Sequence, residues 1–246
     1  MAERHRPSDS VENEFYCLQL LKHLGFQVNR ADIVTFGKAR ALVVERFDRV
    51  WSNGRLIRLP QEDCCQALSV SPVRKYQSHG GPGIRDIAQL LKGADSPASD
   101  HRTLLQAQLV FWLIGATDGH AKNFSIFLHP GGRYALTPLY DVLTAQPSLD
   151  ARQIERKQMK LAMSVGNNNH YRVDEIQTRH FFQTGEASGL SPSLVRSAIE
   201  DVASRMESAL SSLEGELPTD FPPVLHESVK AGVQRRMRVL QAGLGS

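Results

Sequence analysis

Ala116-Thr117-Asp118-Gly119-His120-Ala121-Lys122-Asn123 is the stretch that decides how this chain is interpreted. It follows an apolar run that predicts a buried helix ending near Ile114, and it precedes Phe124, Ile126 and Leu128, whose alternation predicts a strand. A polar loop between two buried elements has to satisfy its polar groups there, and such loops commonly carry function. The side chains of Asp118 and Asn123 are therefore the first candidates for chemistry.

A second carboxylate is expected beside this loop. Pro130-Gly131-Gly132 predicts a turn, and Tyr134 to Leu136 predicts a return strand that brings Asp141 back toward Asn123. Phosphoryl transfer needs an acceptor hydroxyl held in line and magnesium ions that neutralise the phosphate oxygens. Four residues separate Asp118 from Asn123, as they separate the catalytic Asp and the metal-binding Asn of protein kinases.

The motifs of ordinary eukaryotic-type kinases are nevertheless missing. Thr117 precedes Asp118 where such kinases have His-Arg, and Tyr140-Asp141-Val142 stands where they have Asp-Phe-Gly. An Asp and an Asn after a helix can also be plain capping or turn residues. A third alternative is a metal hydrolase built on Asp118 and His120, although no other ligand with suitable spacing lies nearby in the sequence.

The sequence before the loop predicts a helix followed by two hairpin signals. Ser8, Asp9 or Ser10 is expected to cap a helix that stops at Gly25. The runs 33–36 and 41–44 predict a hairpin, and Asn53-Gly54 predicts a second turn. Pro60 is expected to open a short helix through Gln61, Glu62, Cys65 and Leu68.

Most of the remaining chain is expected to be helical. The predicted helices are Ile84–Leu91, a long helix capped by Ser99 or Asp100 and ending at Ile114, Val173–Phe182, Pro192–Leu213 and Pro223–Leu240. The C-terminal Arg235, Arg236 and Arg238 are interpreted as a solvated basic face, and His170, His180 and His226 as residues without metal-ligand spacing. The pattern predicts an α+β fold, with residues 1–58 forming a small β-rich part and 59–246 a mainly helical one.

Composition sets outer limits on function. With 246 residues, 41% hydrophobic residues and a formal charge of +3, the chain can bury a large core but has too weak a basic bias to argue nucleic-acid binding. The three cysteines, Cys17, Cys64 and Cys65, form no pair typical of a disulfide or a zinc site, which suits a reducing cytoplasm. No secretory signal and no membrane-length apolar run is present in the sequence, so no membrane partner is expected.

Residues 114–125 and 136–141 together resemble the signature of the HipA-type serine/threonine kinases. Further stretches follow the order of that family: residues 11–14, 44–49, 59–63, 75–76, 80–83, 160–163 and 179–181. The resemblance implies a protein-kinase-like fold of the HipA type, with a residual small-lobe β-hairpin and hinge before a helical large lobe. It also implies ATP as substrate and Mg²⁺ as cofactor.

The resemblance assigns roles by position. It implies that Asp118 is the catalytic base and that Asn123 and Asp141 bind magnesium. It implies nucleotide contacts for a larger set: Glu45, Arg46 and Phe47 as the hinge whose backbone meets the adenine, and His120, Ala121, Lys122, Asn123, Tyr140 and Asp141 on the phosphate and metal side. The implied partners are a small DNA-binding antitoxin, DNA only through that antitoxin, and a protein substrate, which for some relatives is an aminoacyl-tRNA synthetase.

The family's phosphate loop and ATP-binding lysine are expected upstream of the helix that begins near Val11. Gly80–Gly83 and Gly131-Gly132 lack the strand-before, helix-after arrangement of such a loop. The chain is accordingly expected to be the C-terminal portion of such a kinase, with the first lobe supplied upstream or by a separate polypeptide. The competing hypothesis is an inactive, truncated kinase that acts as a binding module for an antitoxin or a complementing lobe.

Overall fold

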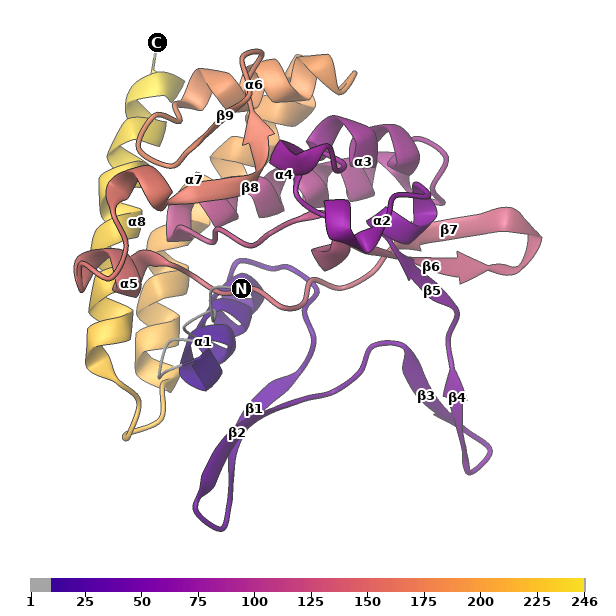
Figure 1. The fold of residues 1–246 in the computed structure, drawn as a ribbon, viewed down its shortest axis with the longest axis horizontal. Coiled ribbons are helices and arrows are strands. Elements are labelled where there is room, and N and C mark those ends of the chain that lie inside the picture. Colours follow the sequence, from indigo (N-terminus) through magenta and orange to yellow (C-terminus); the bar gives the residue numbers. More distant parts are fainter. Residues whose placement is uncertain (1–9, 246) are drawn as a thin grey trace.

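The computed structural model describes residues 10–245 and has an α+β architecture (Figure 1). The helices are α1 (Ser10–His23), α2 (Cys64–Ala67), α3 (Ile84–Leu91), α4 (Pro97–Ile114), α5 (Gln146–Asp150), α6 (Thr178–Ala187), α7 (Pro192–Glu216) and α8 (Pro223–Leu244). The strands are β1 (Ala31–Phe36), β2 (Ala39–Val44), β3 (Arg49–Ser52), β4 (Arg55–Arg58), β5 (Gln61–Asp63), β6 (Ser125–His129), β7 (Arg133–Leu136), β8 (Lys160–Val165) and β9 (His170–Arg172). The predicted α+β class is confirmed.

Two antiparallel hairpins follow α1, as the sequence predicts. In the first, β1 pairs with β2 in a register that places Ile33 opposite Leu42. In the second, β3 pairs with β4 around Asn53-Gly54, and both turn residues have positive φ, as a tight hairpin turn requires. Figure 1 shows both hairpins extending away from the helices. The predicted caps Ser8 and Asp9 lie outside the described residues, and Ser10 is the first residue of α1.

The short helix expected from Pro60 begins later than predicted. Gln61 and Glu62 form β5 and pair with Phe127 and Ile126 of β6, so the predicted helical start there is wrong. Helix α2 starts after Asp63, whose carboxylate accepts a hydrogen bond from the Gln66 N–H at 3.0 Å. The Gln66 side chain accepts the Asp63 N–H in return. This reciprocal cap fixes the helix start, and strand pairing with β6 takes the residues before it.

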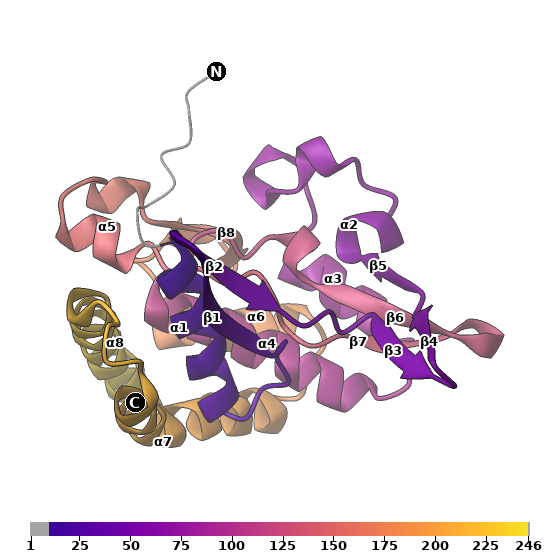
Figure 2. The ribbon, with the colours of Figure 1, turned by 90° about the horizontal axis from the view of Figure 1, so that it is seen from below.

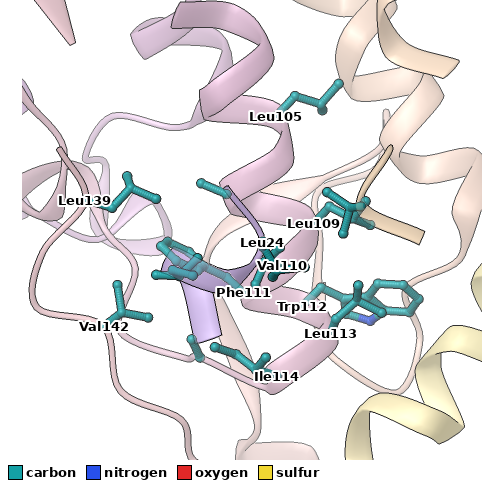
Figure 3. Close-up of a cluster of buried hydrophobic side chains, with 14 of the residues drawn as sticks. Leu24, Leu105, Leu109, Val110, Phe111, Trp112, Leu113, Ile114, Leu139 and Val142 are labelled. Carbon is teal, nitrogen blue, oxygen red and sulfur yellow. The ribbon is translucent and has the colours of Figure 1, made fainter. Parts of the chain in front are cut away.

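Helix α4 forms the centre of the helical part and packs against α3, α6, α7 and α8. Its last six residues, Leu109 to Ile114, are all buried, and Figure 3 shows their side chains within the core. The predicted central position is confirmed. The predicted start is wrong, because Ser96 is the N-cap and Pro97 the first helical residue, and Asp100 instead accepts the Leu136 N–H through its carboxylate.

Helix α1 lies between the first hairpin and α7, with contacts to β1, β2 and α7 (Figure 2). The hairpin of β8 and β9 was missed by the sequence analysis, because residues 161–165 are buried without the alternation that marks a half-exposed strand. The helix predicted from Val173 begins only at Thr178. The helices predicted from Pro192 and Pro223 are confirmed, and both extend a little beyond their predicted ends.

The predicted solvated arginine face on α8 is partly wrong. Arg235 and Arg238 are exposed, but Arg236 is buried and donates to the Leu113 carbonyl oxygen at 2.8 Å and to the Gln146 side-chain oxygen at 2.9 Å. These acceptors offset part of the cost of removing the guanidinium from water. None of the described helices is long and apolar enough to cross a membrane. The boundary between residues 58 and 59 stays a prediction.

Candidate active site

Asn123 and Asp141, the predicted metal pair, meet in the structure. The Asn123 amide nitrogen donates to the Asp141 carboxylate at 2.8 Å and to the Asp141 backbone oxygen at 3.3 Å. The Asn123 side-chain oxygen accepts the His120 N–H at 3.1 Å and so closes the 3₁₀ turn Ala121–Asn123. Asp141 has a φ of 54°, a left-handed conformation that is uncommon outside glycine and is found at functional sites.

The segment that carries Asp141 is held by the N-terminal part of the chain. The Leu139 N–H donates to the Gln27 carbonyl oxygen at 2.9 Å, and the Leu139 carbonyl oxygen accepts the Asn29 N–H at 3.4 Å. Three residues after Asp141, the Asn13 side chain exchanges two hydrogen bonds with the Thr144 backbone, at 2.8 and 2.9 Å. Backbone and side-chain bonds on both sides therefore fix the position of Asp141.

Asp118 lies at the open side of the loop, and about half of its side chain is exposed. Helix α4 ends at Ile114 and is capped by Gly115, whose φ of 71° turns the chain out of the helix toward this carboxylate. The Tyr76 hydroxyl donates a hydrogen bond to Asp118 Oδ1. An accessible carboxylate here is able to orient an acceptor hydroxyl and take its proton.

His120 is buried beneath Asp118, and its Nε2 lies 3.9 Å from Asp118 Oδ1. Burial lowers the pKa of this imidazole, an effect that the Asp118 charge opposes. Neither ring nitrogen of His120 has a hydrogen-bond partner among residues 10–245. The imidazole is thus a neutral group with unused hydrogen-bonding capacity next to the candidate base.

Lys122 and Ala121 occupy different environments. Lys122 Nζ lies 2.5 Å from the Asp63 carboxylate, which also caps α2. The Ala121 methyl group is in the core, so only the Ala121 backbone could contact a nucleotide. The assignment of His120 and Lys122 to the phosphate and metal side stays a prediction.

The predicted hinge reaches the loop through aromatic contacts. The Phe47 ring centroid lies 5.4 Å from that of Tyr140 and 5.6 Å from that of Phe127. The Tyr140 hydroxyl donates to the Lys122 carbonyl oxygen at 2.8 Å, and burial raises its pKa. Glu45 and Arg46 are exposed, and the Arg46 guanidinium is bound to Asp48, which agrees with a hinge that acts through its backbone.

Asp48 stabilises the turn that follows the hinge. This buried carboxylate accepts two hydrogen bonds from the Arg46 guanidinium, at 2.7 and 2.8 Å, and one from Arg49 at 2.6 Å. The Arg46 bonds hold the pKa of Asp48 below its usual range. The chain from 45 to 49 is thus held in one conformation next to Tyr140.

Glu14 and Tyr76 were missed as site residues by the sequence analysis. Burial and, after it, the charge of Asp141 together raise the pKa of Glu14 to about 7. The only signal in the sequence is that both residues fall in stretches, 11–14 and 75–76, that follow the order of the HipA-type kinases. Their roles could not be found from spacing, because they lie far from the loop along the chain.

The residues present suit a hard divalent cation. Carboxylate and amide oxygens are the ligands that magnesium prefers, and the Asn123 oxygen has a second lone pair beside the one that accepts the His120 N–H. The charge of Asp141 is, after burial, the second cause of the raised pKa of Glu14, and a cation at Asp141 would relieve that part of the shift. A hydrolase site on Asp118 and His120 gains no support, since the one group of three His, Cys, Asp or Glu side chains among residues 10–245 that is close enough together to hold a metal is Glu214, His226 and Glu227, on α7 and α8.

Comparison with known proteins identifies the family. A family model described as the HipA-like C-terminal domain matches residues 3–210. The chain belongs to the HipA family. The HipA serine/threonine-protein kinase toxin of Shewanella oneidensis is 32% identical over 222 residues, which cover 85% of this chain and 49% of that protein. A putative kinase of Sinorhizobium fredii, Y4mE, is 37% identical over 161 residues, 64% of this chain and 36% of that protein.

Solved structures agree with the HipA assignment. HipA from the Shewanella oneidensis complex of HipA, HipB and operator DNA aligns with a TM-score of 0.82 and 28% identity, over 98% of this chain and 57% of that one. The proinflammatory kinase CtkA of Helicobacter pylori shares the fold, with a TM-score of 0.66 and 13% identity over 97% of this chain and 88% of that one. The kinase-like HipA fold is confirmed, and the chain spans about half the length of the HipA toxin that it matches.

Proposed function

We propose that this HipA-family chain is the catalytic and metal-binding part of a serine/threonine protein kinase that transfers the ATP γ-phosphoryl group to a protein hydroxyl. The observation that carries the proposal is the meeting of Asn123 and Asp141 at 2.8 Å beside the half-exposed Asp118 carboxylate. Catalysis of phosphoryl transfer consists almost entirely of positioning and charge stabilisation, and these side chains are suited to both.

Each residue has a defined task in this proposal. Asp118 accepts a hydrogen bond from the substrate hydroxyl and so directs the hydroxyl oxygen at the γ-phosphorus. It takes the hydroxyl proton as the new P–O bond forms and the bond between the γ-phosphorus and ADP breaks. Asn123 and Asp141 hold Mg²⁺, which supplies positive charge to the phosphate oxygens when bound. Phe47, fixed against Tyr140, places the backbone of residues 45–47 at the adenine side.

A further lobe is part of the proposal. The two hairpins expose large apolar side chains: Phe36, Val43, Val50, Trp51, Leu56 and Ile57. Exposed apolar groups of this size usually mark a surface that another protein segment covers. We expect a segment carrying the phosphate loop and the ATP-binding lysine to cover these hairpins, which would agree with the share of the HipA toxin that this chain spans.

The biological setting is proposed from the relatives. The Shewanella oneidensis HipA structure contains HipB and operator DNA. We propose for this chain a HipB-like antitoxin partner, contact with DNA only through that antitoxin, a cytoplasmic location and a role as a toxin, with an aminoacyl-tRNA synthetase as a possible class of target.

The test is incorporation of radiolabel from ATP in the presence of Mg²⁺. An Asp118→Asn variant is expected to lose about a hundredfold or more of the rate, the usual contribution of a positioned base. Asp32→Asn, a change of the same type on the exposed part of β1, serves as the control. Equal incorporation by wild type and Asp118→Asn would overturn the assignment of Asp118.

The alternative is a non-catalytic binding module for an antitoxin or a complementing lobe. It is favoured by two contacts that occupy site residues, the Tyr76 hydroxyl on Asp118 and the Asp63 carboxylate on Lys122. Nucleotide titration separates the two functions. Antitoxin binding without any affinity for Mg²⁺-ATP would favour the module, whereas an affinity abolished by Asp141→Ala would favour the kinase.

A further inference from the structure

A cavity of about 700 Å³ lies between α5, the loop 151–159 and α8. Its apolar lining includes Leu149, Ile154, Met159, Val173 and Val239, and its polar lining includes four arginines, Arg152, Arg156, Arg235 and Arg236. None of the residues assigned above to catalysis, metal binding or nucleotide binding lines it. Its volume is in the range of sites that hold small organic ligands.

The acidic side chains around this cavity already have partners. Asp150 accepts hydrogen bonds from the Gln146 amide at 3.0 Å and from the Ser228 hydroxyl at 2.5 Å. Glu155 forms an ion pair with Lys157 at 2.8 Å, and Asp174 forms one with Arg172 at 2.8 Å. The charges of Glu155 and Asp174 are therefore balanced by Lys157 and Arg172, and Asp150, whose hydrogen-bond partners are neutral, is the carboxylate left among four arginines.

Two of the arginines have no partner within the described part of the chain. The guanidinium groups of Arg152 and Arg156 form no hydrogen bond or ion pair with any of residues 10–245, and that of Arg235 comes only within 3.8 Å of Asp150. Arg152 also has a φ of 57°, a conformation that costs energy for a residue with a side chain and that concentrates at functional sites. Unpaired guanidinium groups at the rim of an apolar cavity are ready-made donors for an anion.

The fourth arginine carries its charge inside the protein. Arg236 is 8% exposed, and its Nη2 has no hydrogen-bond acceptor among the described residues. Its other nitrogens donate to neutral oxygens of Leu113 and Gln146, so no carboxylate contacts it, and the charge of Asp150 acts on it only from a distance. A buried cation that contacts no carboxylate is costly, and an anion bound nearby would lower that cost.

We propose that this cavity binds a small organic anion that combines an apolar body with a phosphate or carboxylate group. The apolar residues take the body of the ligand, and Arg152 and Arg156 clamp its anionic group at the rim. Arg236 adds positive potential from the buried side of the cavity. The site is separate from the proposed kinase site, and its occupancy does not depend on ATP or Mg²⁺.

The test is a calorimetric titration of the protein in EDTA with 1-naphthyl phosphate, 1-naphthoate and pyrophosphate. At least one naphthyl anion is expected to bind at a single site, and the two naphthyl arms tell which anionic group is preferred. An Arg152→Ala/Arg156→Ala double variant is expected to weaken that binding by about tenfold or more. An Arg55→Ala/Arg196→Ala variant, which removes the same charge from exposed positions outside the cavity, is expected to bind like the wild type.

Two further variants keep the result interpretable. Ile154→Asp places a carboxylate in the cavity and is expected to abolish binding, whereas Asp141→Ala is expected to leave it unchanged. The proposal is overturned if neither naphthyl anion binds at millimolar concentration, if the double-arginine variant binds as tightly as the wild type, or if Asp141→Ala removes the binding. Pyrophosphate binding as tightly as the naphthyl anions would overturn the role of the apolar lining.

Discussion

The Tyr76 hydroxyl donates a hydrogen bond to the Asp118 carboxylate, and the Tyr76 ring packs edge-on against His120 with 5.1 Å between the ring centroids. Lys75 Nζ lies 5.1 Å from the centre of the same ring. Tyr76 thus contacts one oxygen of the carboxylate that the proposed mechanism assigns to the substrate hydroxyl. A serine or threonine hydroxyl would therefore compete with Tyr76 for this carboxylate.

Replacing Tyr76 by Phe is therefore expected to speed phosphoryl transfer. The change removes a competing hydrogen bond of about 1 kcal/mol, which corresponds to about fivefold in kcat/KM, while keeping the ring on His120. The measurement is incorporation of label from ATP, with Tyr171→Phe as a control away from the loop. A slower Tyr76→Phe enzyme would show instead that the hydroxyl assists the reaction.

Binding of Mg²⁺ is expected to release protons from Glu14. Because the pKa of Glu14 is about 7, this carboxyl is about half protonated at neutral pH, and a cation held by Asp141 lowers that pKa. Titration of Mg²⁺ in buffers of different ionisation enthalpy should therefore reveal up to about half a proton released. Glu14→Gln should abolish the release and Glu207→Gln should retain it; equal release by both variants would contradict the assignment.

Glu14 should also make the protein less stable as pH rises. Its folded pKa is raised from 4.5 to about 7, so the folded state holds the proton more tightly than the unfolded state. The stabilisation is fully present below about pH 4.5 and is lost as pH rises through about 7. Urea unfolding of Glu14→Gln should show a smaller fall in unfolding free energy over this interval, and an unchanged slope would contradict the prediction.

His180 should have the opposite effect at acid pH. Its ring stacks on that of His170 with 3.8 Å between centroids, and burial, followed by the charges of His170 and Arg179, lowers its pKa to about 4. Its contribution to stability is present above about pH 6.5 and is lost as pH falls toward 4. His180→Asn should flatten the dependence of unfolding free energy on pH between 6.5 and 4, whatever its stability at neutral pH.

Gly119 should tolerate no side chain, because a Cβ there would lie 2.5 Å from the buried Phe111 ring. Gly119→Ala is expected to lower the unfolding free energy by about 1–3 kcal/mol and to slow phosphoryl transfer by displacing Asp118. The matched control is Gly215→Ala in α7, where a Cβ would meet open space. That variant should gain about 0.4–1 kcal/mol in urea unfolding, and similar effects of the two changes would contradict this picture.

The local part of the site could be predicted from the sequence. Asn123 and Asp141 are joined by one hairpin, β6 and β7, and a short hairpin brings its two ends together whatever surrounds it. Tyr76 and Glu14 reach the loop from 42 and 127 positions away from Asp118 and Asp141. Such contacts depend on how α1 and the segment after α2 pack, and residue spacing carries no information on that.

Arg236 was wrongly predicted to be solvated, because an arginine on a helix is normally exposed to water. Two neutral acceptors, on Leu113 and Gln146, hold it inside instead, and neither is recognisable without the packing of α8 on α4.

At Pro60 the helix start was wrongly predicted from local propensity. A proline that could begin a helix precedes two residues whose pairing with β6 outweighs that preference.

The exposed hairpins have a consequence for the life of the protein in the cell. Among residues 10–245, β1–β2 and β3–β4 are two-stranded ribbons whose outer edges pair with no other strand, and Trp51 on β3 is 72% exposed. Exposed ribbon edges of this kind promote aggregation, and chains that unfold or aggregate are bound by chaperones and degraded by proteases. We expect the abundance of this chain to follow the supply of whatever covers its hairpins, so that a cell would control the dose of the protein through turnover as well as through catalysis.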